Sequence, residues 1–252
     1  MDRSLAGQAI LVTGASGGIG AAIVERLAAE GARPIIHFGR DKAGAEALLA
    51  RIGGHGWIIQ ADLSTPDGPF ELWRRAVEVA GRVNGLVNNA GIRTEISMDA
   101  SPVDWRAAWQ REFQVNFFAA ADLSKEAILH FKANGGGRIV NIASRAGQRG
   151  YAADAMPYGA TKAALVNLTK SIARSFGAEG VTAVAIAPGW VRTEMAEDFI
   201  AAHGKAAAVA DIPIGEMAEP CEVAELVAFV LRPSQVSLNG ATLDVNGGSY
   251  IR

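Results

Sequence analysis

The stretch that decides the fold is Thr13-Gly14-Ala15-Ser16-Gly17-Gly18-Ile19-Gly20, which joins an apolar run, Ala9–Thr13, to a helical pattern over Ile19–Ala29. Glycine permits positive φ and lets the backbone approach a ligand where a Cβ would collide. The helix N-terminus that follows offers unpaired N–H groups and a partial positive charge, which suit a pyrophosphate. The spacing is G-x-x-x-G-x-G rather than the commoner G-x-G-x-x-G, and any tight turn can use glycine. Its place in the first strand-to-helix connection is what favours dinucleotide binding.

Strand and helix patterns alternate along the whole chain. Short runs rich in β-branched and apolar residues are the predicted strands: Ala9–Thr13, Arg33–Phe38, Gly56–Gln60, Gly85–Asn88, Arg138–Ile142, Thr182–Ala187 and Thr242–Val245. Helical periodicity lies between them: Ile19–Ala29, Ala43–Ile52, Phe70–Ala80, Val103–Lys132, Pro157–Phe176 and Glu222–Leu231. Continuously apolar runs indicate strands covered on both faces. The pattern predicts one α/β domain over residues 1–252, a Rossmann-type doubly wound parallel sheet of about seven strands with helices on both faces.

One segment, Pro188–Pro220, departs from this alternation. It is long, mixed in character and punctuated by proline and glycine. Long loops in compact domains are usually functional, so we expect a substrate lid over about residues 189–219. A plain helical insertion is the alternative.

Composition excludes several classes of protein. The formal net charge is −2, which offers no electrostatic surface for nucleic acid or anionic membrane. No apolar stretch approaches the roughly 20 residues of a membrane helix, and the N-terminus has no signal-peptide pattern. The single cysteine, Cys221, has no partner for a disulfide, and no motif predicts a metal site. We therefore expect a cytoplasmic protein.

The end of the second predicted strand bears on the choice of dinucleotide. An acidic residue there would bind the adenosine ribose and repel a 2′-phosphate. Residues 37–39 contain no acid, and Arg40 could form charge-assisted bonds with a phosphate. Asp41 complicates this interpretation, and Arg40 could also be an ordinary solvated cation. The charge pattern favours NADP(H) over NAD(H).

Four polar residues are candidates for catalysis. Tyr158 and Lys162 lie four apart, so they share a helix face, and a nearby ammonium would lower the phenol pKa enough for proton exchange. Ser144 follows the fifth predicted strand, where its hydroxyl could bind a carbonyl oxygen. Asn116 lies among Phe113, Val115, Phe117 and Phe118, so it needs partners if buried. Each of the four also has an ordinary structural interpretation.

In combination, these motifs resemble the short-chain dehydrogenase/reductase family. The resemblance rests on Thr13–Gly20, Asn88-Asn89-Ala90-Gly91, Asn116, Ser144, Tyr158-x-x-x-Lys162 and Pro188-Gly189, and it covers essentially the whole chain. It implies Tyr158 as general acid/base and Lys162 as the group that lowers its pKa and binds the nicotinamide ribose. It also implies that Ser144 holds the substrate oxygen and that Asn116 anchors a water.

The resemblance further implies how a dinucleotide is held. Asp62 would contact the adenine, Asn89 to Gly91 would line the adenosine side, and Val191 and Thr193 would hold the carboxamide. The implied cofactor-binding residues are Gly14, Ser16, Gly18, Ile19, Gly20, Arg40, Asp62, Leu63, Asn89, Ala90, Gly91, Tyr158, Lys162, Pro188, Gly189, Val191 and Thr193. NADP-preferring relatives often have a basic residue where this chain has Gly17, which leaves Arg40 and Ser16 as the phosphate candidates.

The substrate is expected to be a small carbonyl compound or alcohol. Asp211–Gly215 and Asn246-Gly247-Gly248 resemble 3-oxoacyl thioester reductases, with a sugar or polyol dehydrogenase as the alternative. The arginines that follow motif residues could attract an anionic substrate or be solvated rim charges: Arg93, Arg145, Arg149 and Arg192. A non-catalytic dinucleotide sensor is the alternative of another class. Family likeness implies a homotetramer, or a homodimer, through the helices holding Asn116 and Tyr158.

Overall fold

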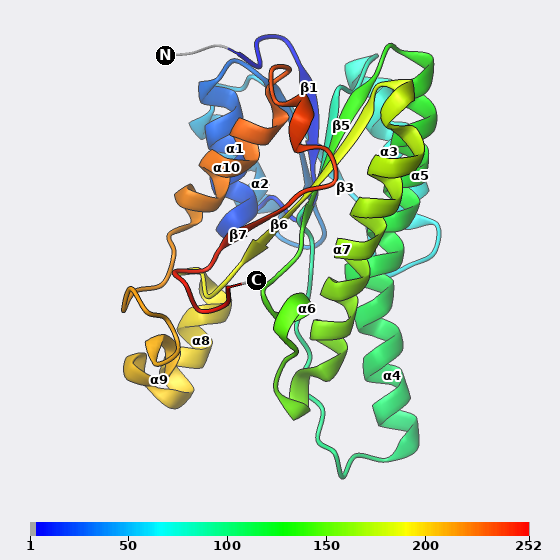
Figure 1. Cartoon of the computed structure of the whole chain (residues 1–252). Coiled ribbons are helices and arrows are strands. Elements are labelled where there is room, and N and C mark those ends of the chain that lie inside the picture. Colours follow the sequence, from blue (N-terminus) through cyan, green and yellow to red (C-terminus); the bar gives the residue numbers. More distant parts are fainter. Residues whose placement is uncertain (1–3, 252) are drawn as a thin grey trace.

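The computed structural model describes residues 4–251, with all side chains in that range except those at 195, 198, 202, 203 and 205. Its centre is a sheet of seven strands in the order β3-β2-β1-β4-β5-β6-β7 (Figure 1). Every strand pair is parallel. The strands are β1 Ala9–Val12, β2 Arg33–Phe38, β3 Trp57–Gln60, β4 Gly85–Asn88, β5 Gly137–Ile142, β6 Val181–Pro188 and β7 Thr242–Val245. The predicted fold class is confirmed.

Helices cover both faces of the sheet because neighbouring strand residues point to opposite sides. Ile10 and Val12 of β1 belong to one apolar cluster, and Leu11 belongs to the other. Helices α1 (Gly18–Ala29), α2 (Lys42–Arg51) and α10 (Pro220–Leu231) pack into the first cluster. Helices α3 (Gly68–Ala80), α5 (Ala119–Ala133) and α7 (Met156–Phe176) pack into the second (Figure 1).

The predicted helix Val103–Lys132 is divided by a π-helical turn. The structure has α4 at Pro102–Phe113, the π turn at Gln114–Phe118 and α5 directly after it. π turns inside helices often lie at functional sites. This one carries Asn116, which is buried.

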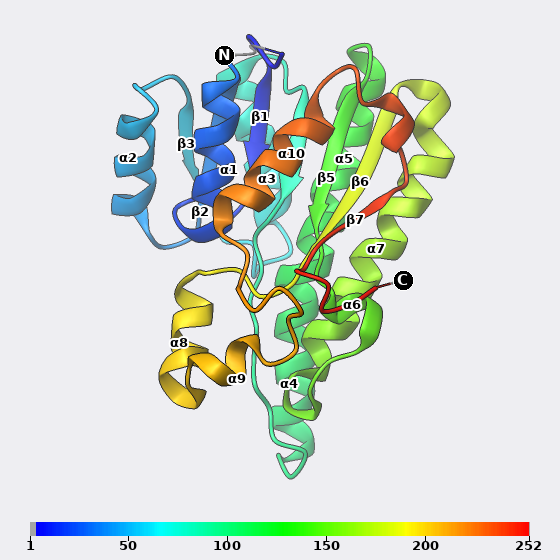
Figure 2. The ribbon, with the colours of Figure 1, turned by 60° about the vertical axis from the view of Figure 1, so that its left-hand side comes forward.

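The segment from Pro188 to Pro220 is partly helical. It contains α8 (Glu194–His203) and α9 (Lys205–Val209). Both helices lie beyond the edge of the sheet at which β6 ends (Figure 2). Ala196, Ala208, Ile212 and Met217 form a small apolar cluster of their own, with Trp190 packed against it. The segment thus combines two short helices with non-helical stretches at 189–193 and 210–219, and its role as a lid stays a prediction.

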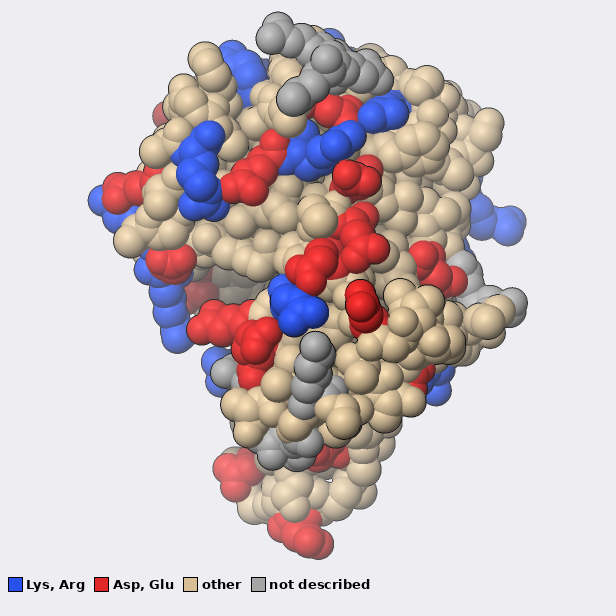
Figure 3. Space-filling model, turned by 90° about the vertical axis from the view of Figure 1, so that its left-hand side faces the viewer, with Lys and Arg blue, Asp and Glu red and all other residues tan. Residues whose placement is uncertain are grey.

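Two further observations concern the surface charges and the helices of the described residues. On the face that Figure 3 shows, acidic and basic side chains of the described residues are interspersed rather than gathered into one basic area. Within residues 4–251, no helix combines the length and apolar character that crossing a bilayer requires.

Candidate active site

The glycine-rich turn follows β1 and leads into the N-terminus of α1. Gly14 and Gly18 have φ of +59° and +54°, a region that favours glycine. A Cβ at Gly14 would lie 2.9 Å from Ala90 Cα, whereas one at Gly17 would meet nothing within 4 Å. The turn thus packs tightly on one side and presents bare backbone to open space on the other. With the α1 N-terminus behind it, this cradle fits the pyrophosphate of a dinucleotide.

Asn89 and Thr13 hold the turn in place. Asn89 Nδ2 donates to the carbonyl oxygens of Thr13 and Gly14, at 2.9 Å each. Thr13 Oγ1 accepts from the backbone N–H groups of Asn89 and Ala90 at 2.9 and 3.0 Å. The side chain of Asn89 therefore braces the turn.

His37 is a functional residue that sequence reasoning missed. It is buried on β2, and its Nδ1 accepts from the Gly14 N–H at 3.0 Å while Nε2 lies 3.2 Å from the Ala61 carbonyl oxygen. Burial lowers the pKa of His37 to about 4, so the imidazole is neutral at ordinary pH. The neutral ring with its proton on Nε2 satisfies both contacts. The sequence around position 37 did not indicate that His37 would accept a hydrogen bond from the glycine-rich turn.

Arg40 and Asp41 follow β2 at the adenosine end predicted from the sequence. Both are exposed. Asp41 caps α2, its carboxylate accepting from Gly44 N–H at 2.9 Å, so this acid is directed to its own helix. Asp62 binds Ser64 N–H and Oγ, and these hydrogen bonds lower its pKa, with a smaller contribution from Arg40.

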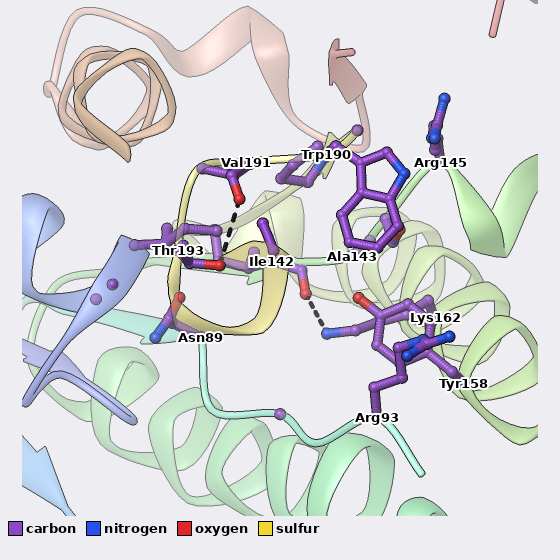
Figure 4. A pocket seen from close by; sticks show the side chains of 18 of the residues that line it. Asn89, Arg93, Ile142, Ala143, Arg145, Tyr158, Lys162, Trp190, Val191 and Thr193 are labelled. Atoms are coloured by element: carbon purple, nitrogen blue, oxygen red, sulfur yellow. Dashed lines mark hydrogen bonds between the residues drawn. The ribbon is translucent and has the colours of Figure 1, made fainter. Parts of the chain in front are cut away.

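Ser144, Tyr158 and Lys162 line one cavity beyond the carboxyl end of β5. Figure 4 shows Tyr158 and Lys162 side by side. Lys162 Nζ donates to the Ile142 carbonyl at 2.8 Å and lies 5.6 Å from the centroid of the Tyr158 ring. A side-chain hydrogen bond joins Ser144 and Tyr158, and Ser144 Oγ also accepts from Ala146 N–H at 3.1 Å. The three predicted side chains are thus neighbours.

Burial governs the proton affinities of Tyr158 and Lys162. Burial raises the pKa of Tyr158 to about 12, although the hydrogen bond from Ser144 opposes the rise. Burial lowers the pKa of Lys162 to about 8, with the Glu112 carboxylate opposing. Burial therefore dominates the phenol pKa in the protein without dinucleotide, and the lowering by Lys162 that the sequence implies stays a prediction. The ammonium lies over the ring and is bonded to Ile142, and loss of solvent around the phenol has the larger effect.

Asn116 acts on the loop that follows β4. Its Oδ1 accepts from Ile92 N–H at 2.8 Å, and its Nδ2 donates to the Ile92 carbonyl at 2.9 Å and to Thr161 Oγ1 at 3.2 Å. A Cβ at Gly91 would lie 3.4 Å from both Asn116 Oδ1 and Lys162 Nζ. Asn116 therefore fixes the strand-end loop beside Lys162.

Glu112 was also missed by sequence reasoning. It lies one turn before Asn116, is fully buried, and accepts from Thr94 N–H at 3.4 Å. Burial raises the pKa of Glu112 to about 7, against the lowering effect of the Thr94 hydrogen bond and of Arg93 and Lys162. The sequence did contain one indication of this: Glu112 lies four residues before Asn116, and residues four apart share a helix face.

The chain after β6 closes the other side of the site. Gly189 N–H donates to the Val245 carbonyl at 2.8 Å, and a Cβ at Gly18 would lie 3.4 Å from Thr193 Cγ2. Trp190 packs on Phe199 with the ring centroids 4.8 Å apart. Thr193 therefore lies over the start of α1.

These elements surround a cavity of about 370 Å³. The predicted site residues that line it are Gly18, Ile19, Gly20, Asn89, Gly91, Ser144, Tyr158, Lys162, Pro188, Gly189, Val191 and Thr193. Other predicted residues lie outside its lining: Gly14, Ser16, Arg40, Asp62, Leu63, Ala90 and Asn116. Ala90 packs beneath Gly14, Asn116 lies behind Gly91, and Arg40 and Asp62 interact with each other at the ends of neighbouring strands.

Comparisons with known proteins agree with this geometry. The family model described as short chain dehydrogenase matches residues 8–203. The 3-oxoacyl-[acyl-carrier-protein] reductase of Vibrio cholerae is 34% identical over 249 residues, covering 98% of this chain and 99% of the relative. The cis-4-hydroxycyclohexanecarboxylate dehydrogenase of Sinomonas cyclohexanicum is 36% identical, covering 98% of each chain.

Two solved structures are equally similar in fold. A short chain dehydrogenase from Burkholderia cenocepacia in complex with NADP gives a TM-score of 0.88 at 35% identity, covering 98% of this chain and 99% of that one. The 3-ketoacyl-(acyl-carrier-protein) reductase from Brucella melitensis complexed with NADH gives 0.88 at 31% identity, covering 98% and 100%. The chain belongs to the short-chain dehydrogenase family. It is an oxidoreductase that acts on CH–OH or C=O groups with a nicotinamide dinucleotide.

Proposed function

We propose that this enzyme reduces a ketone to a secondary alcohol, with Tyr158 as the proton donor. The observation that carries the proposal is the convergence of Tyr158, Ser144 and Lys162 in one cavity with the glycine-rich cradle. A phenol whose pKa burial raises to about 12 stays protonated at neutral pH, which suits donation to a developing alkoxide. The non-catalytic alternative leaves this arrangement unexplained.

Each polar residue has a separate task. The nicotinamide, when bound, supplies the hydride. Ser144 Oγ hydrogen-bonds the substrate oxygen, and Tyr158 gives that oxygen its proton as the C–O bond becomes single. Lys162 supplies positive charge beside the phenol and would bind the nicotinamide ribose. Asn116 holds Ile92 and the loop beside Lys162, so its main role is positioning.

For the cofactor, we propose NADP(H) in preference to NAD(H). Arg40 is exposed at the end of β2, and the Asp41 carboxylate is occupied by Gly44 N–H. A guanidinium can bind a 2′-phosphate through charge-assisted hydrogen bonds. Ser16 lies beside α2, the helix that begins two residues after Arg40, with its carbonyl oxygen close to Gly44, and would contribute to the same phosphate site. Asp62, Leu63 and Ala90 would bound the adenosine.

The relatives suggest a 3-oxoacyl thioester as the first substrate to examine, with sugars and polyols as the alternative. The segment over residues 189–219 would act as a lid, since Trp190, Val191 and Thr193 line the cavity. A steady-state assay of NADPH and NADH oxidation with a 3-oxobutanoyl thioester, simple ketones and a ketose tests the proposal. Turnover of at least one ketone supports it. A folded protein that binds dinucleotide but reduces none of them would overturn it.

We also propose a homo-oligomer, a tetramer or dimer, through α5 and α7. An apolar groove runs between the two helices, and Leu129, which lines it, exposes 56% of its surface. Light scattering of the purified protein should give a mass of two or four chains, and a monomer would contradict the proposal.

A further inference from the structure

Four arginines near the site could recognise an anionic substrate, and the structure assigns three of them to other tasks. Arg145 and Arg149 both bind the Asp211 carboxylate, at 3.1 and 2.8 Å. Figure 4 shows the Arg145 side chain directed away from Tyr158. Arg192 pairs with Glu219 at 2.7 Å on the exposed surface. The contacts of Arg145 and Arg149 attach the segment after β6 to the body of the protein, and the Arg192–Glu219 pair joins the two ends of that segment.

Arg93, the fourth, is built into the wall of the cavity. Its side chain is 14% exposed, and its guanidinium lies 5.6 Å from the centroid of the Tyr151 ring, which itself packs against Tyr158. Nη1 donates to Glu95 at 2.7 Å, and a further hydrogen bond reaches Tyr151. Nε is buried and has no hydrogen-bond partner within the described part of the chain. A guanidinium has five N–H donors, so these contacts leave part of it unused.

The loop that carries Arg93 is held on both sides of it. Asn116 binds both polar backbone atoms of Ile92, and Glu112 binds the Thr94 N–H. These two side chains come from successive turns of one helix. Further along, Ile96 N–H donates to the Asp154 carbonyl at 2.7 Å. The anchored neighbours fix the position of Arg93 next to the catalytic tyrosine, an arrangement that an incidental surface cation would not need.

The charges around the cavity favour an anion at this point. Its charged lining residues are Arg93, Arg145, Lys162 and Glu194, and Glu194 lies at the opposite side, beside Thr193 and Gly18. Arg145 shares the Asp211 carboxylate with Arg149, and Lys162 is bonded to Ile142. Arg93 is paired with Glu95, so this pair would have to open or share the guanidinium with the substrate. The acids nearest to Arg93 are Glu95, whose side chain is 57% exposed, and the buried Glu112. A planar guanidinium binds a carboxylate through two parallel charge-assisted hydrogen bonds.

We infer that the physiological substrate carries a carboxylate besides the reacting carbonyl, and that Arg93 binds this carboxylate. Arg93 is then the residue that distinguishes an oxo acid from a neutral ketone or thioester. The reaction converts an oxo acid, NAD(P)H and one proton into a hydroxy acid and NAD(P)+, with the proton coming from Tyr158. This inference rests on the proposed ketone reduction and adds the substrate class to it.

The test compares charged and neutral forms of the same ketones. The substrates are 3-oxobutanoate, 4-oxopentanoate and 5-oxohexanoate, each with its methyl ester, and the neutral N-acetylcysteamine thioester of 3-oxobutanoate. For at least one chain length, kcat/KM of the wild type should be at least about tenfold higher for the acid than for its ester, the size of one good ionic contact. Arg93→Met should lower the ratio of kcat/KM for the acid to kcat/KM for its ester by at least about fivefold, because the acid loses an ionic contact that the ester does not make.

Two further variants separate recognition from folding. Arg93→Lys keeps a cation and should retain part of the preference, and Arg106→Met, on the exposed surface of α4, should keep all of it. The inference is overturned if the esters or the thioester are preferred at every chain length, or if Arg93→Met lowers acid and ester equally. If no ketone of either kind is reduced, the proposed function itself fails. Reduction of the esters alone leaves that function standing and rejects only the carboxylate.

Discussion

Replacing Glu112 by glutamine should make the protein relatively more stable as the pH rises. Burial raises the pKa of Glu112 from an ordinary 4.5 to about 7 in the folded chain. The carboxyl therefore carries no electrostatic cost below pH 4.5, and stability is lost as the pH rises through 7 and the buried group ionises. The full difference corresponds to about 3 kcal/mol, since one pKa unit is worth about 1.4 kcal/mol.

Urea unfolding at matched protein concentration measures this effect. Between about pH 5 and pH 7.5, the free energy of unfolding of Glu112→Gln minus that of the wild type should increase by about 2 kcal/mol. Glu46→Gln, at an exposed position on α2, is the matched control and should show no comparable increase. A constant difference for Glu112→Gln across this range would refute the reasoning, because it would mean that Glu112 ionises alike in the folded and unfolded chains.

The same substitution has a kinetic consequence. The Glu112 carboxylate raises the pKa values of both Tyr158 and Lys162. Its removal should therefore shift the pH profile of alcohol oxidation to lower pH. Equal profiles for the variant and the wild type would show that Glu112 has only a structural role.

Three other substitutions test separate parts of the structure. Arg40→Ser should raise KM for NADPH by about tenfold with little change for NADH, the loss of a charge-assisted contact; equal changes for both would reject Arg40 as the phosphate ligand. His37→Leu removes the acceptor for Gly14 N–H, so dinucleotide affinity by fluorescence titration should fall together with about 1–3 kcal/mol of stability; unchanged affinity would contradict its positioning role. Thr169→Val leaves buried Asn141 Nδ2 without its acceptor at 2.9 Å and should cost about 1–3 kcal/mol in urea unfolding. An unchanged midpoint would show that this buried network is dispensable.

Most of the fold follows from local sequence patterns. The seven strands lie within one or two residues of the predicted ranges, because continuous apolar runs mark strands that are buried on both faces. Two features of the fold could not be predicted from local sequence, because they depend on contacts between distant segments. The π turn at Gln114–Phe118 arises where Asn116 reaches the loop after β4, and α8 and α9 form because their apolar residues meet each other.

The part of the site that the order of the motifs along the chain predicts is the cluster of polar side chains after β5. Ser144, Tyr158 and Lys162 come together because β5 ends and α7 begins at the same edge of the parallel sheet. His37 and Glu112 escaped prediction because their roles depend on partners distant in the sequence, Gly14 and Thr94. The elevated pKa of Tyr158 escaped for a related reason, since burial is a property of the packed structure.

The central claim is that Tyr158 donates the proton during ketone reduction. Single-turnover reduction of a ketone by Tyr158→Phe, preloaded with NADPH, tests it most directly, because dinucleotide binding is then separated from chemistry. The rate constant should fall by about 10²–10⁴, the range for loss of a general acid, while the Kd for NADPH stays within about threefold of the wild-type value. A variant that reduces the ketone as fast as the wild type would contradict the assignment.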